Sequence, residues 1–292
     1  MKKNNDMSDY FTTDELASIL RIKPRKVYDL VSKNQVPYTK VMGKLLFSKK
    51  EVNEWLNSSK SLEKKYILPK VILGSHDPLL EETLKRSNCG IAISFDGSKK
   101  GISRMNNFEG FASGLHVFEE ETEEWNIGTI KNELNNMEVV LMEWAKRSRG
   151  LVFKKNKNVI NSIKDLKNLH FANRQDGSGT KIYLDYLLKK NKIDQKNFKS
   201  INTFYTETDA VMSVYEGETD FAFGLKSEAI KFNLDFIELV KERFDIVLDR
   251  RSFFEDSFQK LIKYCNTENF KKLLLKFDGY DVSNFGKFHY IS

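Results

Sequence analysis

From Val71 onward, short apolar runs alternate with segments of helical periodicity. A run of this length fits one buried strand, and strands that alternate with helices are typical of α/β domains with mostly parallel sheets. We therefore expect an α/β fold in this part of the chain. The expected strands are 71–73, 91–93, 111–118, 139–144, 151–153, 169–171, 221–223 and 244–248, and the helical patterns include 79–85, 179–189, 209–215, 254–264 and 270–275.

The chain of 292 residues is longer than one hydrophobic core usually organises, so we expect more than one compact unit. With 40% hydrophobic and 30% charged residues, the sequence has enough apolar material for packed cores. Its two cysteines, Cys89 and Cys265, are too few for a disulfide framework. No apolar run is long enough to span a bilayer, and residues 1–6 do not resemble a secretory signal. A cytoplasmic protein without a membrane partner is expected.

The excess positive charge is confined to the first quarter of the chain. Residues 1–70 contain 15 Lys and Arg against 8 Asp and Glu, whereas the remaining residues contain 33 of each. Nucleic-acid-binding proteins concentrate basic residues in this way because phosphate groups must be neutralised locally, although a lysine-rich solubilising tail has the same composition. The pattern of the segment has to decide between these two interpretations.

The basic segment predicts a small unit with the order helix, turn, helix, β-ribbon, helix. Thr12 and Glu15 have the spacing of a capping box at the start of the first helix. Pro24 suits the first turn of a second helix. The two ribbon strands are expected at 36–41 and 45–47, with a turn at 42–44 and a third helix after Ser48.

The motifs Thr-Thr-Asp-Glu-Leu-Ala at 12–17 and Phe-Ser-Lys-Lys-Glu-Val at 47–52 resemble the excisionase-like branch of the MerR-type winged helix-turn-helix families. The likeness covers nearly the whole segment 10–56. It implies that 24–33 is the recognition helix in the major groove of double-stranded DNA and that the ribbon is a wing over the phosphates. The DNA contacts that it implies are Lys23, Arg25, Lys26, Tyr28, Lys40 and Lys44.

A polar stretch with few apolar residues follows the third helix and predicts a linker. We therefore divide the sequence into a winged helix-turn-helix unit at 1–57, a linker at 58–69 and an α/β ligand domain at 70–292. No internal repeat or low-complexity tract suggests another division.

Glycine and hydroxyl residues follow three of the expected strands, at the points where helices begin, in the turns 74–78, 96–101 and 173–180. Such turns bind oxyanions because a helix N-terminus presents free N–H groups, glycine lets the backbone approach, and Ser or Thr adds a neutral donor. Ligands of open α/β sheets collect at these strand ends. The third turn is the richest, since it combines two glycines and two hydroxyl groups with Arg174. None of the turns satisfies the P-loop or Rossmann pattern.

Together with 149–152 and 217–224, these turns look like a type II periplasmic-binding-protein fold, similar to molybdate- and tungstate-binding receptors. The resemblance implies two lobes, about 70–149 with 246–292 and about 150–245. They would be joined by crossover strands near 149–153 and 243–248. The implied cleft has Ser75 and Ser98 on one lobe and Arg174, Ser178, Gly179 and Thr180 on the other, with His76, Thr208 and Asp209 as additional candidates.

The identity of the anion stays open at this point. Tungstate and molybdate are fully deprotonated near neutral pH and need only donors, whereas hydrogen phosphate also needs an acceptor, and Asp176 fits either case. The resemblance favours tungstate or molybdate as the effector, then phosphate or sulfate, then an organic anion. Leu225 stands where some molybdate receptors have a tyrosine. No other cofactor and no cationic metal site is expected.

No catalytic constellation competes with a binding function. The contiguous carboxylates of 119–124 are typical of a solvated loop, and no local Ser-His-Asp or Cys-His motif occurs. We therefore expect a one-component transcriptional regulator, and not an enzyme, that senses a small oxyanion and binds double-stranded DNA, alone or as a homodimer. The alternative is a solute-binding protein for phosphate, sulfate or an organic anion, with an N-terminal protein-interaction module.

Overall fold

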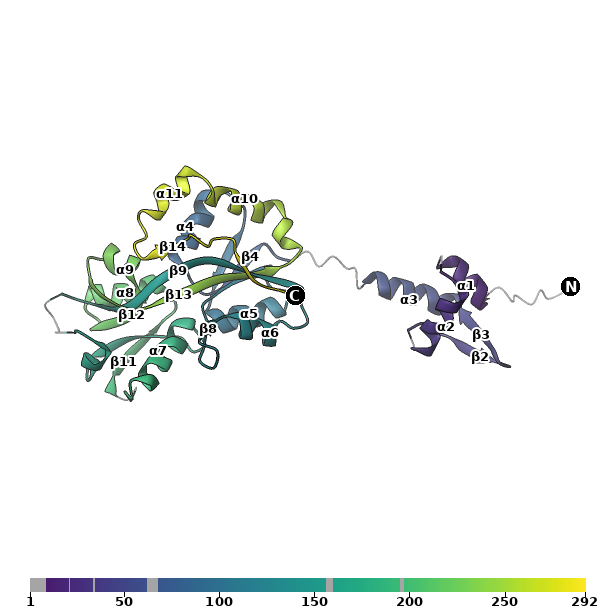
Figure 1. The fold of residues 1–292 in the computed structure, drawn as a ribbon, viewed down its shortest axis with the longest axis horizontal. Helices are drawn as coiled ribbons and strands as arrows, with labels where there is room; N and C mark the ends of the chain where they lie inside the picture. The colour runs from purple at the N-terminus through teal and green to yellow at the C-terminus, as the bar shows by residue number, and fades with distance from the viewer. Residues whose placement is uncertain (1–8, 21, 34, 62–67, 156–159, 195–196) are drawn as a thin grey trace. The chain divides into compact units, whose positions relative to one another are not determined.

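The chain forms two compact units, Met1–Ile67 and Leu68–Ser292, in a computed structural model (Figure 1). The structure describes residues 9–20, 22–33, 35–61, 68–155, 160–194 and 197–292. The segment expected to be a linker, 58–69, begins inside a helix that continues to Ser61, and its residues 62–67 lie outside the described residues.

The first unit has, in its described residues, three helices and a three-stranded antiparallel sheet. Its elements are β1 (Tyr10–Phe11), α1 (Thr13–Ile19), α2 (Pro24–Ser32), β2 (Thr39–Val41), β3 (Lys44–Ser48) and α3 (Lys49–Ser61). The predicted capping box is confirmed, because Thr12 Oγ1 accepts from the Glu15 N–H at 3.3 Å and the Glu15 carboxylate accepts from the Thr12 N–H at 2.8 Å. Strand β1 pairs with β3 and was not predicted from the sequence.

The ribbon of the first unit turns at Met42 and Gly43, whose φ angles of 47° and 83° are both positive. Two-residue hairpin loops with positive φ at both positions match the twist of the flanking strands, and glycine adopts such an angle without strain. The predicted ribbon is therefore present. Its first strand starts at Thr39 and not at Val36, because Val36 is buried in the core with Val27 of α2.

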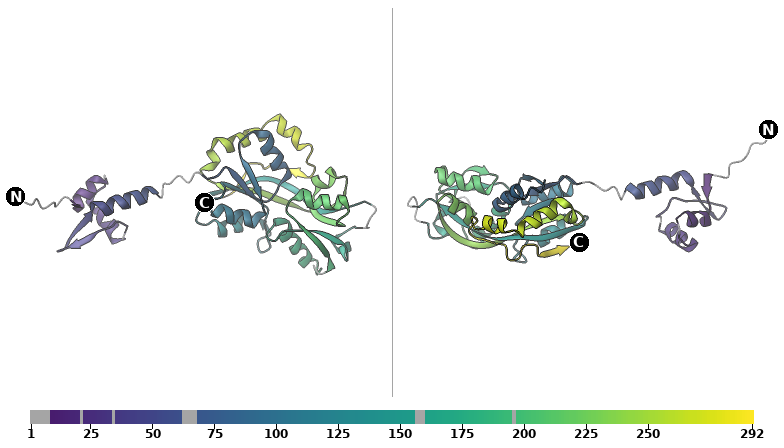
Figure 2. Two further views of the ribbon diagram at one scale, coloured as in Figure 1. Left: turned by 180° about the vertical axis from the view of Figure 1, so that it is seen from behind. Right: turned by 90° about the horizontal axis from the view of Figure 1, so that it is seen from above.

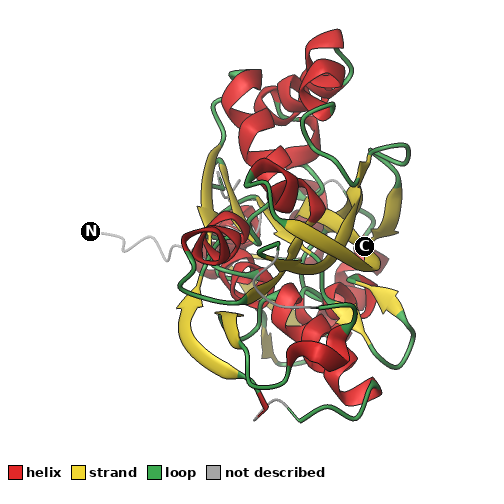
Figure 3. Ribbon diagram, turned by 90° about the vertical axis from the view of Figure 1, so that its left-hand side faces the viewer, coloured by secondary structure: helices red, strands yellow, loops and turns green. Residues whose placement is uncertain are grey.

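The second unit is built on a mixed sheet with helices on both faces (Figures 1 and 3). Its strands are β4 (Val71–Gly74), β5 (Ala92–Phe95), β6 (Ala112–Leu115), β9 (Val139–Phe153), β10 (His170–Arg174), β11 (Lys199–Phe204), β12 (Phe221–Leu225), β13 (Asp235–Asp249), β14 (Tyr280–Asp281) and β15 (Phe288–Ile291). The sheet order is β11-β10-β12-β9-β13-β6-β4-β5, and β14 and β15 also pair with β9. The β4–β5, β4–β6, β10–β11 and β10–β12 pairs are parallel, which confirms the α/β fold class.

Two antiparallel strands of 15 residues each, β9 and β13, join the two halves of the sheet and contain the expected crossover segments (Figure 1). The division of β9 into two strands, 139–144 and 151–153, was wrong. Charged residues interrupt the apolar pattern there, but Arg147 and Arg149 are both 0% exposed and belong to the same strand. A buried strand can carry such side chains where ion pairs compensate their charge.

Alternate residues of these strands pack against helices on opposite faces of the sheet. In lobe 1, Phe244 and Ile246 join the core under α4 (Pro78–Ser87), α10 (Asp256–Cys265) and α11 (Glu268–Leu274), whereas Val247 joins the core under α5 (Ser98–Asn106) and α6 (Ile127–Glu133). In lobe 2, Leu151 packs with α7 (Gly179–Lys190) and Val152 with α8 (Glu207–Glu216) and α9 (Lys226–Lys231). Figure 2 shows these layers from behind and from above.

The remaining described elements are short. A hairpin, β7 (Phe118–Glu119) and β8 (Glu124–Trp125), contains the acidic segment, whose residues 120–124 are exposed as expected for a solvated loop. Two 3-10 helices are at Ile163–Leu166 and Ser252–Phe254. The hairpin contacts α7 of lobe 2, where Phe118 and Trp125 pack against Tyr183.

Candidate functional site

The six residues predicted to contact DNA are all exposed in the first unit. Lys23 directly precedes α2, Arg25, Lys26 and Tyr28 lie on α2, and Lys40 and Lys44 lie on β2 and β3. Val27, on the same helix, is 0% exposed and faces the core. The positive end of the α2 dipole and its neighbouring basic side chains are therefore both available to a phosphate backbone.

In the second unit, the two serines predicted on lobe 1 lie together. The Ser75 and Ser98 hydroxyl oxygens are 2.9 Å apart, and both side chains are buried. Ser98 is the first residue of α5, and its Oγ also accepts from the His116 N–H at 3.4 Å. The loops after β4 and β6 thus bring the Ser75 hydroxyl and the His116 N–H to Ser98 at the N-terminus of α5.

The turn predicted to be richest in anion contacts faces these serines from lobe 2. The Lys99 N–H donates to the Gly177 carbonyl oxygen at 3.3 Å, and a Cβ atom added at Gly179 would clash with the His116 carbonyl oxygen. Glycine is therefore required at this position for the two lobes to approach as closely as they do. Ser178 caps α7 by accepting from the Lys181 N–H at 3.2 Å.

The lobe junction can supply hydrogen-bond donors that carry no charge. Gly179 and Thr180 are the first two residues of α7, so their N–H groups have no acceptor within the helix. The Ser178 hydroxyl accepts from a backbone N–H and keeps its own hydrogen for another acceptor. These groups and Ser98 come from opposite lobes and are all buried.

The central ion pairs of the junction were not predicted. The Glu207 carboxylate, at the start of α8, is 1% exposed and lies between two guanidinium groups. Arg149 donates to both of its oxygens at 3.0 Å, and Arg174 Nη1 lies 2.8 Å from Oε1. The Thr180 hydroxyl donates to the same Oε1 at 2.9 Å.

Arg174 is engaged entirely by groups of lobe 2. Besides its ion pair with Glu207, its Nε donates to the Phe204 carbonyl oxygen at 3.0 Å and its Nη2 donates to the Tyr205 carbonyl oxygen at 3.1 Å. The residue expected to provide the countercharge of the ligand is thus already paired with a carboxylate. It also fixes the segment between β11 and α8.

A second buried carboxylate, Glu242 on β13, completes the cluster. Its Oε2 lies 2.8 Å from Arg149 Nε and 2.9 Å from His116 Nδ1, and its other oxygen accepts from Arg147. Arg147 also donates to Asp77 at 2.8 Å. The cluster joins lobe 1, lobe 2 and both crossover strands.

The charges in this cluster compensate one another. Burial alone would raise the pKa of Glu207, but Arg149 and Arg174 outweigh burial and hold that pKa well below its usual range. Burial likewise opposes the ionisation of Glu242, yet Arg147 and Arg149 keep its pKa low. Burial lowers the pKa of His116, so its ring is neutral near pH 7. The three arginines thus face three carboxylates, those of Asp77, Glu207 and Glu242.

The additional candidates fall into different places. His76 lies at the junction, where its Nδ1 accepts from the Glu207 N–H at 3.1 Å and its Nε2 lies 2.9 Å from Glu81. Thr208 is half-buried and lines a separate pocket, and Asp209 is exposed. Neither Thr208 nor Asp209 forms a hydrogen bond or an ion pair with the serines or with the α7 N-terminus.

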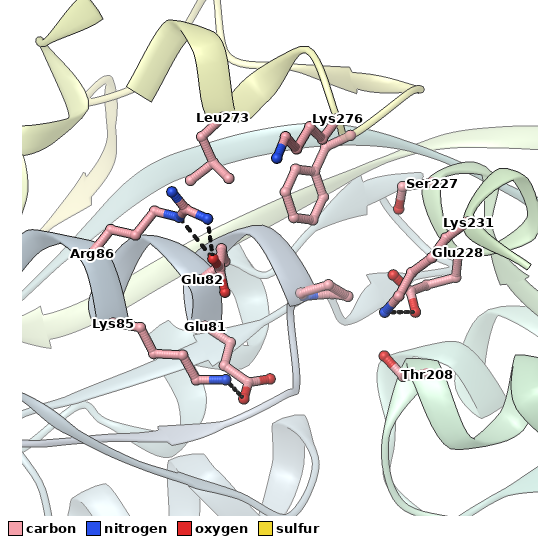
Figure 4. Close-up of a pocket in the computed structure, with 12 residues that line it drawn as sticks. Glu81, Glu82, Lys85, Arg86, Thr208, Ser227, Glu228, Lys231, Leu273 and Lys276 are labelled. Atoms are coloured by element: carbon pink, nitrogen blue, oxygen red, sulfur yellow. Dashed lines mark hydrogen bonds and ion pairs between the residues drawn. The ribbon is translucent and has the colours of Figure 1, made fainter. Parts of the chain in front are cut away.

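That separate pocket, of about 390 Å³, lies between α4 and α11 of lobe 1 and α8 and α9 of lobe 2 (Figure 4). Each carboxylate of its lining is paired with a cation of the same lining. The pairs are Glu81 with Lys85 and Glu82 with Arg86, both at 2.7 Å, and Glu228 with Lys231 at 3.3 Å. The fourth cation of the lining, Lys276, has no ion pair with a carboxylate of the lining, so these side chains together carry one excess positive charge.

Comparison with protein families identifies the second unit. The model of the PBP superfamily domain matches residues 81–266, which is more than half of the chain. The chain belongs to the PBP superfamily. A second family model, a helix-turn-helix domain, matches residues 10–60 and confirms the predicted class of the first unit. Neither model is that of an enzyme family, and the combination fits a ligand-sensing, DNA-binding regulator.

Several relatives resemble this PBP superfamily chain. The uncharacterized protein YvgK of Bacillus subtilis (strain 168) is 25% identical over 307 aligned residues, which cover 97% of this chain and 98% of YvgK. A histidine kinase sensor domain with similarity to periplasmic binding proteins is 14% identical, with a TM-score of 0.47 and coverage of 72% and 96% of the two chains. The CcmR regulatory domain of Synechocystis PCC6803, in complex with 2-PG, is 14% identical, with a TM-score of 0.45 and coverage of 66% and 92%.

The residues that the structure describes contain neither a membrane-spanning helix nor a cluster of metal ligands. Among their helices, none is long and apolar enough to cross a membrane. Their His, Cys, Asp and Glu side chains form no group of three or more that could hold a metal ion.

Proposed function

We propose that the chain is a one-component transcriptional regulator whose PBP superfamily domain binds a small oxyanion at the lobe junction, with tungstate or molybdate as the favoured effector. One observation carries this proposal. Uncharged polar groups from both lobes, the Ser75–Ser98 hydroxyl pair and the N-terminus of α7, both lie against His116 in the buried junction of a domain linked to a helix-turn-helix unit.

The chemistry of these donors supports a fully deprotonated anion. Helix N-termini and hydroxyl groups stabilise negative charge through oriented dipoles, so the ligand does not need a free cation beside it. The arginines nearby are already compensated by Asp77, Glu207 and Glu242. Tungstate and molybdate offer acceptors only and suit donors of this kind, and sulfate shares that property. Hydrogen phosphate would also need an acceptor for its proton.

The same geometry supports a route from ligand to DNA. An anion held by donors of both lobes binds more tightly when the lobes are in contact, and only such a difference in affinity can shift an equilibrium between two arrangements. If the arrangement of the lobes alters DNA binding, reciprocity requires DNA to alter anion affinity by the same factor.

The test uses the full chain. Calorimetric titration with tungstate, molybdate, sulfate and phosphate measures binding, and a DNA titration with and without the anion measures coupling. Ser98→Ala should lower the affinity for the anion by about 2- to 10-fold, since a neutral hydrogen bond contributes roughly 0.5 to 1.5 kcal/mol. Ser103→Ala, on the exposed side of α5, is the matched control and should bind normally. The proposal would be contradicted if none of the four anions bound, or if the DNA affinity were unchanged at a saturating concentration of the anion.

A further inference from the structure

The buried carboxylate of Glu207 contacts two residues that the sequence predicted to bind the ligand. Its Oε1 lies 2.8 Å from Arg174 Nη1 and 2.9 Å from Thr180 Oγ1, and Arg149 binds both of its oxygens at 3.0 Å. The contacts of Thr180 and Arg149 are hydrogen bonds to a charged group, whereas Arg174 Nη1 forms an ion pair with Oε1 and has no hydrogen-bond partner among the described residues. Two predicted anion contacts, Arg174 and Thr180, therefore bind a carboxylate of the chain itself.

The charge of Glu207 also sets the electrical balance of the junction. With Glu207 ionised, Arg147, Arg149 and Arg174 face an equal number of carboxylates. Without it, one guanidinium charge would stay uncompensated in a site from which water is excluded, where charges interact more strongly than in bulk solvent. The junction would then attract an anion by charge and not only by hydrogen bonds.

We propose that Glu207 is an internal competitor of the ligand and the residue that sets the anion affinity and selectivity of the lobe junction. This inference rests on the proposed function. An oxyanion gains the guanidinium groups of Arg149 and Arg174 only by displacing the carboxylate, and an anion that binds beside it is repelled by it. Anions that form few hydrogen bonds at the junction are excluded by this repulsion. The anion that binds is the one that accepts hydrogen bonds from the uncharged donors.

Glu207 couples this competition to the contact between the lobes. Its N–H donates to His76 Nδ1 of lobe 1 at 3.1 Å, and it is the first residue of α8 in lobe 2. Displacement of the side chain therefore perturbs a hydrogen bond between the lobes and the first turn of a helix. Hydrogen exchange at the Glu207 amide therefore measures this displacement independently of the ligand affinity.

The experiment compares the full-length wild-type protein with Glu207→Gln. The substitution keeps the size of the side chain and removes its charge, so tungstate should bind about tenfold more tightly or better, because a like charge within the same buried cluster is gone. Glu216→Gln removes the same charge from the exposed last residue of α8 and should leave the affinity unchanged. Calorimetry measures affinity, and hydrogen exchange follows the first turn of α8 with and without tungstate.

Equal or weaker tungstate binding by Glu207→Gln would overturn the proposal, because it would show that the carboxylate only positions the arginines. Glu207→Asp is a second variant for the case in which Glu207→Gln does not fold. It keeps the charge but moves the carboxylate away from Thr180 and Arg174. It should bind tungstate more tightly than wild type, and weaker binding would again overturn the proposal. If wild type binds no tungstate but Glu207→Gln does, the role of Glu207 as a competitor is supported and the proposed function is contradicted. If neither protein binds tungstate, both proposals are contradicted.

Discussion

Substitution of Gly179 by alanine should separate the lobes without unfolding either of them. The first turn of α7 has no positive φ at this residue, so alanine can adopt its backbone conformation. The added Cβ, however, would clash with the carbonyl oxygen of His116 and with its ring. A backbone oxygen cannot rotate out of the way, so lobe 2 must move away from lobe 1.

The expected size of the effect follows from the hydrogen bonds beside that contact. The Lys99 N–H donates to Gly177 at 3.3 Å, and the Glu207 N–H donates to His76 at 3.1 Å, in both cases across the junction. At roughly 0.5 to 1.5 kcal/mol each, their loss costs the closed arrangement about 1 to 3 kcal/mol. The amides of Lys99 and Glu207 should therefore exchange about 5- to 150-fold faster. Within the helix, alanine is a better helix former than glycine, so thermal stability should not fall.

Hydrogen exchange of the full chain measures this without any ligand. Gly128→Ala is the matched control, since Gly128 also lies in the first turn of a helix, and the nearest atoms to its added Cβ belong to the Glu119 side chain of the same lobe, which accepts hydrogen bonds from that turn. The control should leave exchange at Lys99 unchanged. Wild-type exchange rates at Lys99 and Glu207 in Gly179→Ala would refute the argument, and so would a large fall in melting temperature, which would indicate unfolding of lobe 2.

Three further outcomes are expected. Burial raises the pKa of Asp245 to about 6, above its ordinary value of 3.8, so the folded state binds this proton more tightly and the group adds stability as the pH falls from 6 to 4. Urea unfolding should show the difference in stability between wild type and Asp245→Asn changing by about 2 kcal/mol between pH 6 and pH 4, and a constant difference would contradict it. The double variant Arg25→Ala with Lys26→Ala should bind DNA more weakly, with a salt slope smaller by about 2 and an unchanged melting curve. Val27→Ala, in the core of the first unit, should destabilise that unit by about 2 kcal/mol and reduce DNA binding only as far as it unfolds.

Much of the fold could be predicted because its signals are local. The Thr12 capping box, the positive-φ turn at Gly43 and the Ser178 cap each involve residues close together in sequence. The strand β11 was missed since its segment, Lys199–Phe204, lacks a continuous apolar run. The continuity of β9 was missed for a related reason, because charged residues in its middle looked exposed.

In the candidate site, too, the residues in local motifs were predicted from the sequence and the long-range pairs were not. The glycine and hydroxyl turns were visible because each combines a strand end with the first residues of a helix. Arg149 and Glu207 are 58 positions apart, and no local pattern pairs them. The one available signal was two arginines, Arg147 and Arg149, which alternate onto the same face of a strand between two apolar runs, and a strand buried in this way requires compensating carboxylates elsewhere in the chain.

The sequence by itself determined the two-unit organisation, the helix-turn-helix class of the first unit, the α/β class of the second and the turns that meet between its lobes. These properties depend on capping, periodicity and turn chemistry, which act over a few residues. Only the tertiary structure decided that Arg174 is paired with Glu207 and that the buried charges balance. Charge compensation inside a protein depends on which side chains are brought within a few ångströms of each other, and here the packing of both lobes against β9 and β13 sets those distances.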